Sequence, residues 1–112
     1  MILVDTHLLI WAAMGSPRLS EAARAAIDFP APPPLFSAAS IWEVAMKSAL
    51  GRPDFAVDPR RLRRDLLASD YRELDVTSAH GIEAAGLPPH HRDPFDRMLL
   101  GQALSEGLTL LT

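Results

Sequence analysis

Apolar residues occur along the chain in two patterns, and the two patterns alternate. Short runs without helical spacing predict β-strands at residues 2–4, 35–36, 73–76 and 108–111. Stretches with apolar residues three and four positions apart predict helices at residues 7–14, 21–28, 37–50, 59–68, 78–86 and 93–106. Strands that alternate with helices form parallel βαβ units with right-handed crossovers. We therefore expect an α/β fold with about four parallel strands and helices on both faces of the sheet.

Capping and breaking residues support most of these helix boundaries. Ser20, Thr77 and Asp93 are predicted N-caps, and a glycine follows several of the helices. The proline-rich segment 30–34 is expected to be a connector, because proline breaks both helices and central strands. The helix at 59–68 is expected to turn three leucines toward the core: Leu62, Leu66 and Leu67.

The start of the helix at 37–50 has two interpretations. Ser37 directly precedes the helix and is a candidate N-cap. Ser40 stands in the Ser-x-x-Glu relation of a capping box to Glu43, so it is a second candidate. Gly51 and Pro53 predict where this helix ends.

Composition narrows the class of protein. The chain has 112 residues, of which 48% are hydrophobic and 22% are charged, as expected for a single globular domain over residues 1–112. Without cysteine it has neither disulfides nor thiolate metal sites. No apolar run approaches the ~18 residues of a membrane span and no secretory signal is visible, so we expect a cytoplasmic protein that does not bind membranes. The net charge of −3 argues against a nucleic-acid binder that works by bulk electrostatics, but not against a metal-dependent nuclease.

Acidic residues stand where strands end and helices begin. Asp5 follows the first strand, Glu43 lies in the helix at 37–50, and Asp93 and Asp96 open the helix at 93–106. Strand carboxyl ends and helix starts share one edge of a parallel sheet, where ligands bind. Clustered carboxylates suit Mg²⁺ or Mn²⁺, and they ionise together more readily when a cation neutralises them. The pattern therefore predicts metal-assisted hydrolysis of a phosphodiester, with the metal activating water.

Each acid also has a purely structural explanation. Asp5 and Asp93 can act as N-caps, Glu43 can complete the capping box, and Asp96 can interact favourably with the helix dipole. Asp93 and Asp96, however, fall on one face of their helix at i and i+3. The set of acids is therefore a stronger indication of a metal site than any one of them.

Three ordered segments of the chain are familiar together. They read Ile-Leu-Val-Asp-Thr-His at 2–7, Ser-Ala-Ala-Ser-Ile-Trp-Glu-Val-Ala at 37–45, and His-Arg-Asp-Pro-Phe-Asp-Arg-Met-Leu at 91–99. They resemble the PIN-domain family, and most of all its VapC branch of toxin ribonucleases from type II toxin–antitoxin pairs. The resemblance implies a three-layer α/β/α sandwich and a Mg²⁺- or Mn²⁺-dependent endoribonuclease. It also implies neutralisation by a small cognate antitoxin protein, and a homodimer.

The same resemblance assigns roles to individual acids. By position, Asp5, Glu43 and Asp96 match the family's catalytic, metal-binding acids, and Asp93 is a neighbour that binds metal or caps the helix. The family usually carries a further acid or a polar substitute, and often a fifth strand, after the strand that here ends in Leu-Leu-Thr. The printed sequence stops at Thr112, before this further acid and before the fifth strand. We therefore expect the fifth strand to be missing and the activity to be reduced.

Other polar residues near these segments are candidates for substrate contacts. Thr6 matches the small hydroxyl residue that follows the family's first acid, and Thr6, Arg97 and Lys47 are expected to contact substrate. Lys47 can instead pair with Glu43 at i, i+4. The histidines at 90 and 91 are expected to make loop or substrate contacts, since imidazole is a poor choice for Mg²⁺.

Two further groups favour structural interpretations. The basic cluster in the helix at 59–68, formed by Arg60, Arg61, Arg63 and Arg64, is typical of a solvated helix face, with RNA contact as the alternative. Trp11 and Trp42 are expected to be core or interface residues, and an apolar face around Leu8 and Trp42 could serve a dimer.

Two rival functions use the same sequence features. A haloacid-dehalogenase-like phosphatase would use Asp5 as its nucleophile, but it would also need an Asp two positions later, where this chain has His7. A PIN-like module that binds a partner without catalysis is the second rival.

Overall fold

The chain alternates strands and helices as predicted. The computed structural model describes residues 1–28, 32–51, 55–89 and 93–112. Its elements in chain order are β1 (Ile2–Val4), α1 (Thr6–Met14), α2 (Glu21–Asp28), β2 (Leu35–Ser37), α3 (Ala38–Ala49), α4 (Pro59–Ala68), β3 (Arg72–Leu74), α5 (Ser78–Ala85), α6 (Pro94–Glu106) and β4 (Thr109–Leu111). The first part of the predicted connector at 30–34, and the helix stop at Pro53, lie outside the described residues.

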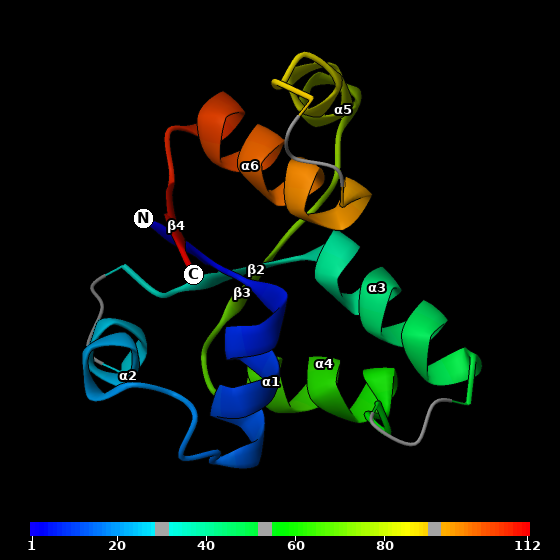
Figure 1. The fold of residues 1–112 in the computed structure, drawn as a ribbon. Helices are drawn as coiled ribbons and strands as arrows, with labels where there is room; N and C mark the ends of the chain where they lie inside the picture. The colour runs from blue at the N-terminus through cyan, green and yellow to red at the C-terminus, as the bar shows by residue number, and fades with distance from the viewer. Residues whose placement is uncertain (29–31, 52–54, 90–92) are drawn as a thin grey trace.

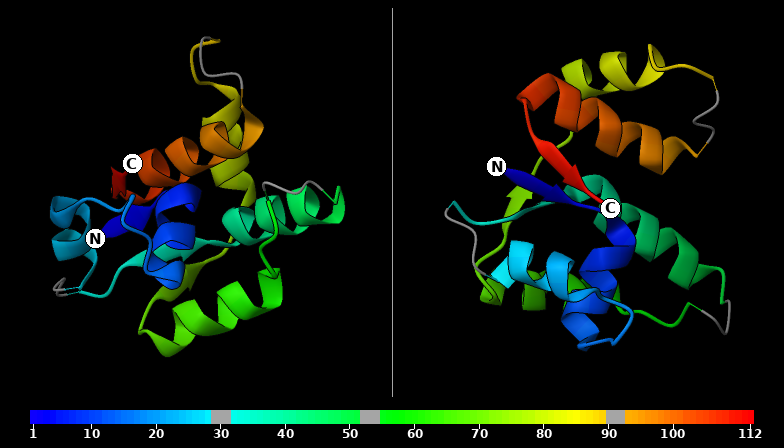
Figure 2. Two further views of the ribbon diagram at one scale, coloured as in Figure 1. Left: turned by 60° about the horizontal axis from the view of Figure 1, so that its bottom comes forward. Right: turned by 60° about the vertical axis from the view of Figure 1, so that its left-hand side comes forward.

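Four strands of the described chain form one parallel sheet in the order β3-β2-β1-β4. The sheet lies between two layers of helices, with α5 and α6 on one face and α1, α2 and α4 on the other (Figures 1 and 2). Helix α3 leaves the carboxyl end of β2 and runs along the open side of the sandwich, near both layers (Figure 1). This arrangement confirms the predicted parallel α/β/α fold.

The central strand is buried on both faces, which explains its apolar sequence. Leu3 and Val4 are completely buried, and adjacent residues of a strand point to opposite faces. Val4 joins the larger hydrophobic cluster with residues such as Leu9 and Phe36, whereas Leu3 packs with Leu35 and Leu99 of α6. The short run 2–4 therefore holds both helical layers onto the sheet.

Local capping agrees with the sequence at several helix ends. Ser20 Oγ accepts a hydrogen bond from the amide of Ala23 at 3.1 Å, as expected of an N-cap. Thr77 caps α5 in a capping box, in which the His80 side chain accepts from the Thr77 amide. Gly15 and Gly107 end α1 and α6 in the left-handed conformation, which glycine adopts without strain.

Three predictions about individual positions were wrong. The third strand covers residues 72–74 and not 73–76, because it pairs residue by residue with the three-residue β2 and ends with it. Leu67 is 40% exposed, since α4 buries Leu62 and Leu66 one turn apart and turns the next residue outward. Leu8 is buried, so it contributes to the core and not to an external apolar face.

Helices α5 and α6 pack unusually closely at Gly101. A Cβ atom at this position would lie 2.8 Å from the His80 carbonyl oxygen and 2.8 Å from the Ala84 amide nitrogen. The buried His80 Nε2 also lies 2.8 Å from the Glu106 carboxylate, which joins the two helices at another point. The middle and the end of α6 are thus fixed against α5.

The sequence predicts no membrane span, and the described residues contain no helix with the length and apolarity to form one.

Candidate functional site

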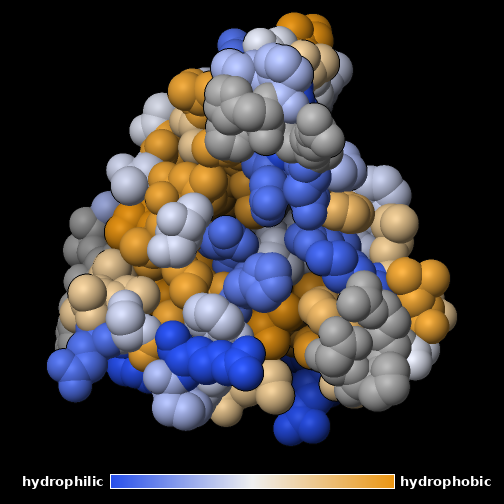
Figure 3. Space-filling model, viewed as in Figure 1, coloured by the Kyte–Doolittle hydropathy of each residue, from blue (hydrophilic) through white to orange (hydrophobic). Residues whose placement is uncertain are grey.

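The predicted acids lie within electrostatic range of one another near the carboxyl edge of the sheet, where α1, α3 and α6 begin. Hydrophilic side chains gather at the centre of this face of the molecule (Figure 3). The acids come from different parts of the chain, and each is held by a helix that follows or lies beside a strand.

Asp5 is fixed by the last strand as well as the first. Its amide donates to the carbonyl of Leu111 at 2.9 Å, which extends the pairing of β1 with β4. Its carboxylate accepts a hydrogen bond from the amide of His7 at 3.3 Å, so Asp5 is the N-cap of α1. One carboxylate oxygen serves this cap, which leaves the other for a further ligand.

Glu43 is buried in α3 and does not complete a capping box. Ser37 is the N-cap of α3, with its Oγ accepting from the amide of Ala39 at 3.0 Å. The alternative in which Ser40 caps this helix is therefore wrong. Glu43 is 3% exposed, and its Oε2 lies 2.6 Å from Lys47 Nζ, one turn along the helix. The predicted i, i+4 pair is confirmed.

Asp93 and Asp96 lie in the first turn of α6. The Asp93 carboxylate accepts from the amides of Phe95 at 2.8 Å and Asp96 at 3.3 Å, which confirms Asp93 as the N-cap. Asp96 lies three residues later, on the exposed side of the helix start.

The carboxylates repel one another. Partial burial raises the pKa of Asp96, and the negative charges of Asp93, Asp5 and Glu43 raise it further. His7 acts in the opposite direction and lowers this pKa. Asp96 thus interacts with the charges of all three other acids, which places the four within electrostatic range of one another.

This donor set fits a hard divalent cation in its chemistry. Carboxylate oxygens are the ligands that Mg²⁺ and Mn²⁺ prefer, and a cation would relieve the repulsion that raises the pKa of Asp96. The side chains do not form a closed coordination shell: among the described residues, no three acids or histidines converge closely enough to hold a metal. The observed contacts account for this, because Asp5 and Asp93 cap their helices and Glu43 binds Lys47.

Sequence reasoning missed a buried contact beside the acids. Thr6, next to Asp5, donates from Oγ1 to Ser40 Oγ at 2.8 Å, and both side chains are almost completely buried. The contact joins the first turns of α1 and α3. Two hydroxyl residues at the two helix starts were the only signal in the sequence. The predicted contact of Thr6 with substrate stays a prediction.

Arg97 has a structural role in α6. Its guanidinium donates to the backbone carbonyls at the end of α5, including Ala84 at 2.8 Å and Leu87 at 3.0 Å. A cation at this position stabilises the carboxyl end of a helix. Its predicted contact with substrate also remains a prediction.

The basic cluster lies away from these contacts. Arg60, Arg61, Arg63 and Arg64 are all on the exposed side of α4, as expected of a solvated helix face. Arg63 pairs with Glu73 at 3.0 Å. The histidines at 90 and 91 lie outside the described residues.

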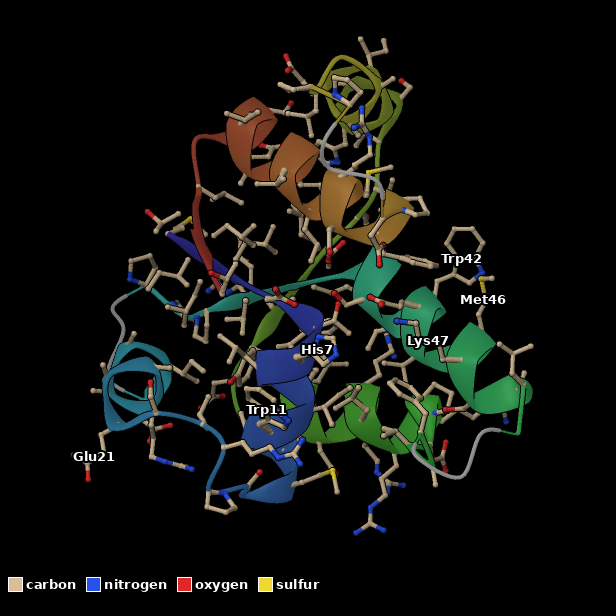
Figure 4. All side chains as sticks on the ribbon, viewed as in Figure 1. His7, Trp11, Glu21, Trp42, Met46 and Lys47 are labelled. Carbon is tan, nitrogen blue, oxygen red and sulfur yellow. The ribbon has the colours of Figure 1, made fainter. Side chains whose placement is uncertain are left out.

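An apolar groove of about 510 Å³ lies between α3 and α6 and is lined by residues of both helices and by Val76. Trp42, which is 63% exposed, packs edge-on against Phe95 with the ring centroids 5.4 Å apart. Trp42 and Met46 point outward from α3, whereas Lys47 points inward (Figure 4). Trp42 is therefore a surface residue, as an interface residue would be, and Trp11 is partly buried against the core.

Comparison with known proteins gives one family and one fold. The model of the PIN domain matches residues 2–112. Among solved structures, a toxin–antitoxin complex from Klebsiella pneumoniae superposes with a TM-score of 0.67 at 20% identity, covering 100% of this chain and 85% of that chain. VapBC2 from Rickettsia felis, bound to a DNA fragment from its promoter, superposes with a TM-score of 0.69 at 14% identity, covering 100% and 87%. No curated protein sequence matches significantly.

Proposed function

This chain belongs to the PIN domain family, and on that premise we propose that it is an endoribonuclease that uses Mg²⁺ or Mn²⁺ and acts as the toxin of a toxin–antitoxin pair. The observation that carries the proposal is the placement of Asp5, Glu43, Asp93 and Asp96 near the carboxyl edge of the sheet in a chain of this family, where their charges together raise the pKa of Asp96. Such repulsion is destabilising by itself, and it is typical of a site built for a divalent cation.

Asp5, Glu43 and Asp96 would hold the cation, and Asp93 would assist while it caps α6. A bound divalent cation lowers the pKa of a coordinated water and shields the phosphate charge. The chain's own residues supply the geometry: the Leu111 carbonyl fixes the backbone of Asp5, and the Thr6–Ser40 hydrogen bond joins α1 to α3. The proposed substrate contacts of Thr6, Arg97 and Lys47 would orient the phosphodiester.

A cleavage assay tests the activity. We expect purified protein to cut RNA internally with Mn²⁺ or Mg²⁺ and to lose that activity in EDTA, because the acids alone provide no cation. A single-stranded DNA of the same sequence is the substrate control. Cleavage that persists in EDTA would contradict the metal-dependent mechanism. Tight binding of RNA or of a protein without any cleavage would favour the rival, a binding module.

We propose a small antitoxin protein as the partner. The fold similarity to two solved toxin–antitoxin assemblies supports this proposal. Expression together with the product of a small neighbouring reading frame, followed by copurification and loss of RNA cleavage, is the expected result.

We further propose a homodimer, with a second copy of this chain covering the groove beside Trp42. The support is the exposed Trp42–Phe95 pair with Met46 at its side, an apolar surface that a free monomer would leave in water. Sedimentation velocity is expected to give a dimer for the natural chain and a monomer for Trp42→Glu. A dimer that survives this substitution would place the interface elsewhere.

A further inference from the structure

Lys47 occupies the position of a counter-ion beside the buried acid. Its Nζ lies 2.6 Å from Glu43 Oε2, and the side chains of Glu43 and Lys47 are 4% and 29% exposed. The ammonium also lies 5.8 Å from the centroid of the Phe55 ring. Lys47 therefore contacts the carboxylate while it remains accessible to water.

This contact satisfies a charge that is costly to bury alone. A buried carboxylate without a partner destabilises a protein strongly, and a nearby ammonium removes much of that cost. The pair lies within one helix at i, i+4, so it forms without any rearrangement of the backbone.

The same contact opposes metal binding. The Lys47 ammonium, 2.6 Å from Glu43 Oε2, occupies one lone-pair direction of that oxygen and offsets the negative charge of the carboxylate, so Glu43 is a weaker ligand for a divalent cation while this pair persists. A unit positive charge so close to the site also repels a second cation. The absence of a converged group of three acids in the described chain agrees with a side chain that is already engaged.

We propose that Lys47 is a positioning residue that neutralises Glu43 in the metal-free protein and competes with the divalent cation for this carboxylate. The inference rests on the proposed function and adds a control on metal affinity. When a cation takes the carboxylate, the flexible lysine is released beside the acids. The Lys47 ammonium would thus pair with Glu43 in the metal-free protein and contact a substrate phosphate once the cation is bound.

The test compares Lys47→Met, which keeps the apolar stem and removes the charge, with Lys47→Arg, which keeps the charge. Mn²⁺ alone is titrated by calorimetry into each protein and into the natural chain. We expect Lys47→Met to bind Mn²⁺ roughly tenfold more tightly, because one repelling charge is gone, and Lys47→Arg to stay within about threefold of the natural chain. Lys47→Gln repeats the test if the methionine variant does not fold.

Thermal unfolding gives a second readout that does not depend on activity. Lys47→Met is expected to unfold at a lower temperature than the natural chain in EDTA. Addition of Mn²⁺ is expected to raise the melting temperature of Lys47→Met more than that of the natural chain. Binding of Mn²⁺ by Lys47→Met that is equal to or weaker than that of the natural chain, or absent from both, would overturn the inference.

The two proposals fail separately. Tighter Mn²⁺ binding by Lys47→Met in a protein that cuts no RNA would support the role of Lys47 and contradict the ribonuclease. Metal-dependent RNA cleavage with no gain in Mn²⁺ affinity would support the ribonuclease and contradict the role of Lys47.

Discussion

Asp5→Asn is expected to lower the rate of RNA cleavage by at least about 100-fold, which corresponds to a loss of about 2.7 kcal/mol or more of transition-state stabilisation. An amide oxygen is a weaker ligand than a carboxylate for a hard cation, so the first acid of the site would no longer hold it. The fold should survive, because asparagine caps a helix as well as aspartate does and can accept the same hydrogen bond from His7. Cleavage and Mn²⁺ binding are measured on the same preparation.

Asp58→Asn is the matched control for this substitution. Asp58 caps α4 as Asp5 caps α1, with its carboxylate accepting from the amide of Arg60 at 3.0 Å. Asp58 is not among the charges that act on Asp96. Its variant should therefore cleave RNA at the natural rate, whereas full activity in Asp5→Asn would remove Asp5 from the mechanism.

Gly101→Ala is expected to lower the free energy of unfolding by about 3 kcal/mol, which is typical of overpacking in a rigid core. The added Cβ would meet backbone atoms of α5 at 2.8 Å, and backbone cannot move aside as a flexible side chain can. The two helices would have to separate, which also strains the contact between His80 and Glu106. Thermal unfolding should show the melting temperature falling by roughly 10 °C.

Gly81→Ala provides a control with the opposite sign. Gly81 lies in α5, and a Cβ there would have no neighbour within 4 Å outside its own helix. Alanine in a helix interior is more stable than glycine by about 0.5–1 kcal/mol, so this variant should be slightly stabilised. A Gly101→Ala protein with the same melting temperature as the natural chain would show that α5 and α6 do not pack this closely.

Local structure could be predicted well because neighbouring residues determine it. Pro94 with Asp93 before it, and Gly107 after the helix, are sufficient to predict α6. The end of β3 depends instead on its partner, because the length of β2 and their register limit the pairing. Likewise, the burial of Leu8 depends on which side of α1 faces the sheet, which the nearly uniform apolar sequence of that helix does not indicate.

Much of the candidate site follows from topology. A parallel sheet brings Asp5, Glu43 and Asp96 to one edge, so their grouping could be predicted from the order of the strands and helices alone. What could not be predicted was the choice between competing partners. Ser37 and Ser40 are equally suitable caps by residue type, and only the start of the helix decides that Ser40 binds Thr6 instead. Similarly, the sequence did not decide whether Lys47 pairs with Glu43 or contacts a substrate phosphate, because both are anions that an ammonium can bind.

The central place of β1 determines when the candidate site can form during synthesis of the chain. The strand made first pairs on one side with β4, and the Asp5 amide bonds to the Leu111 carbonyl. A ribosome adds about 5–20 residues each second, so roughly a hundred residues and several seconds separate these partners. Until β4 emerges, Asp5 belongs to an unfinished sheet. In the proposed ribonuclease, the first acid of the site would therefore reach its final position only late in synthesis.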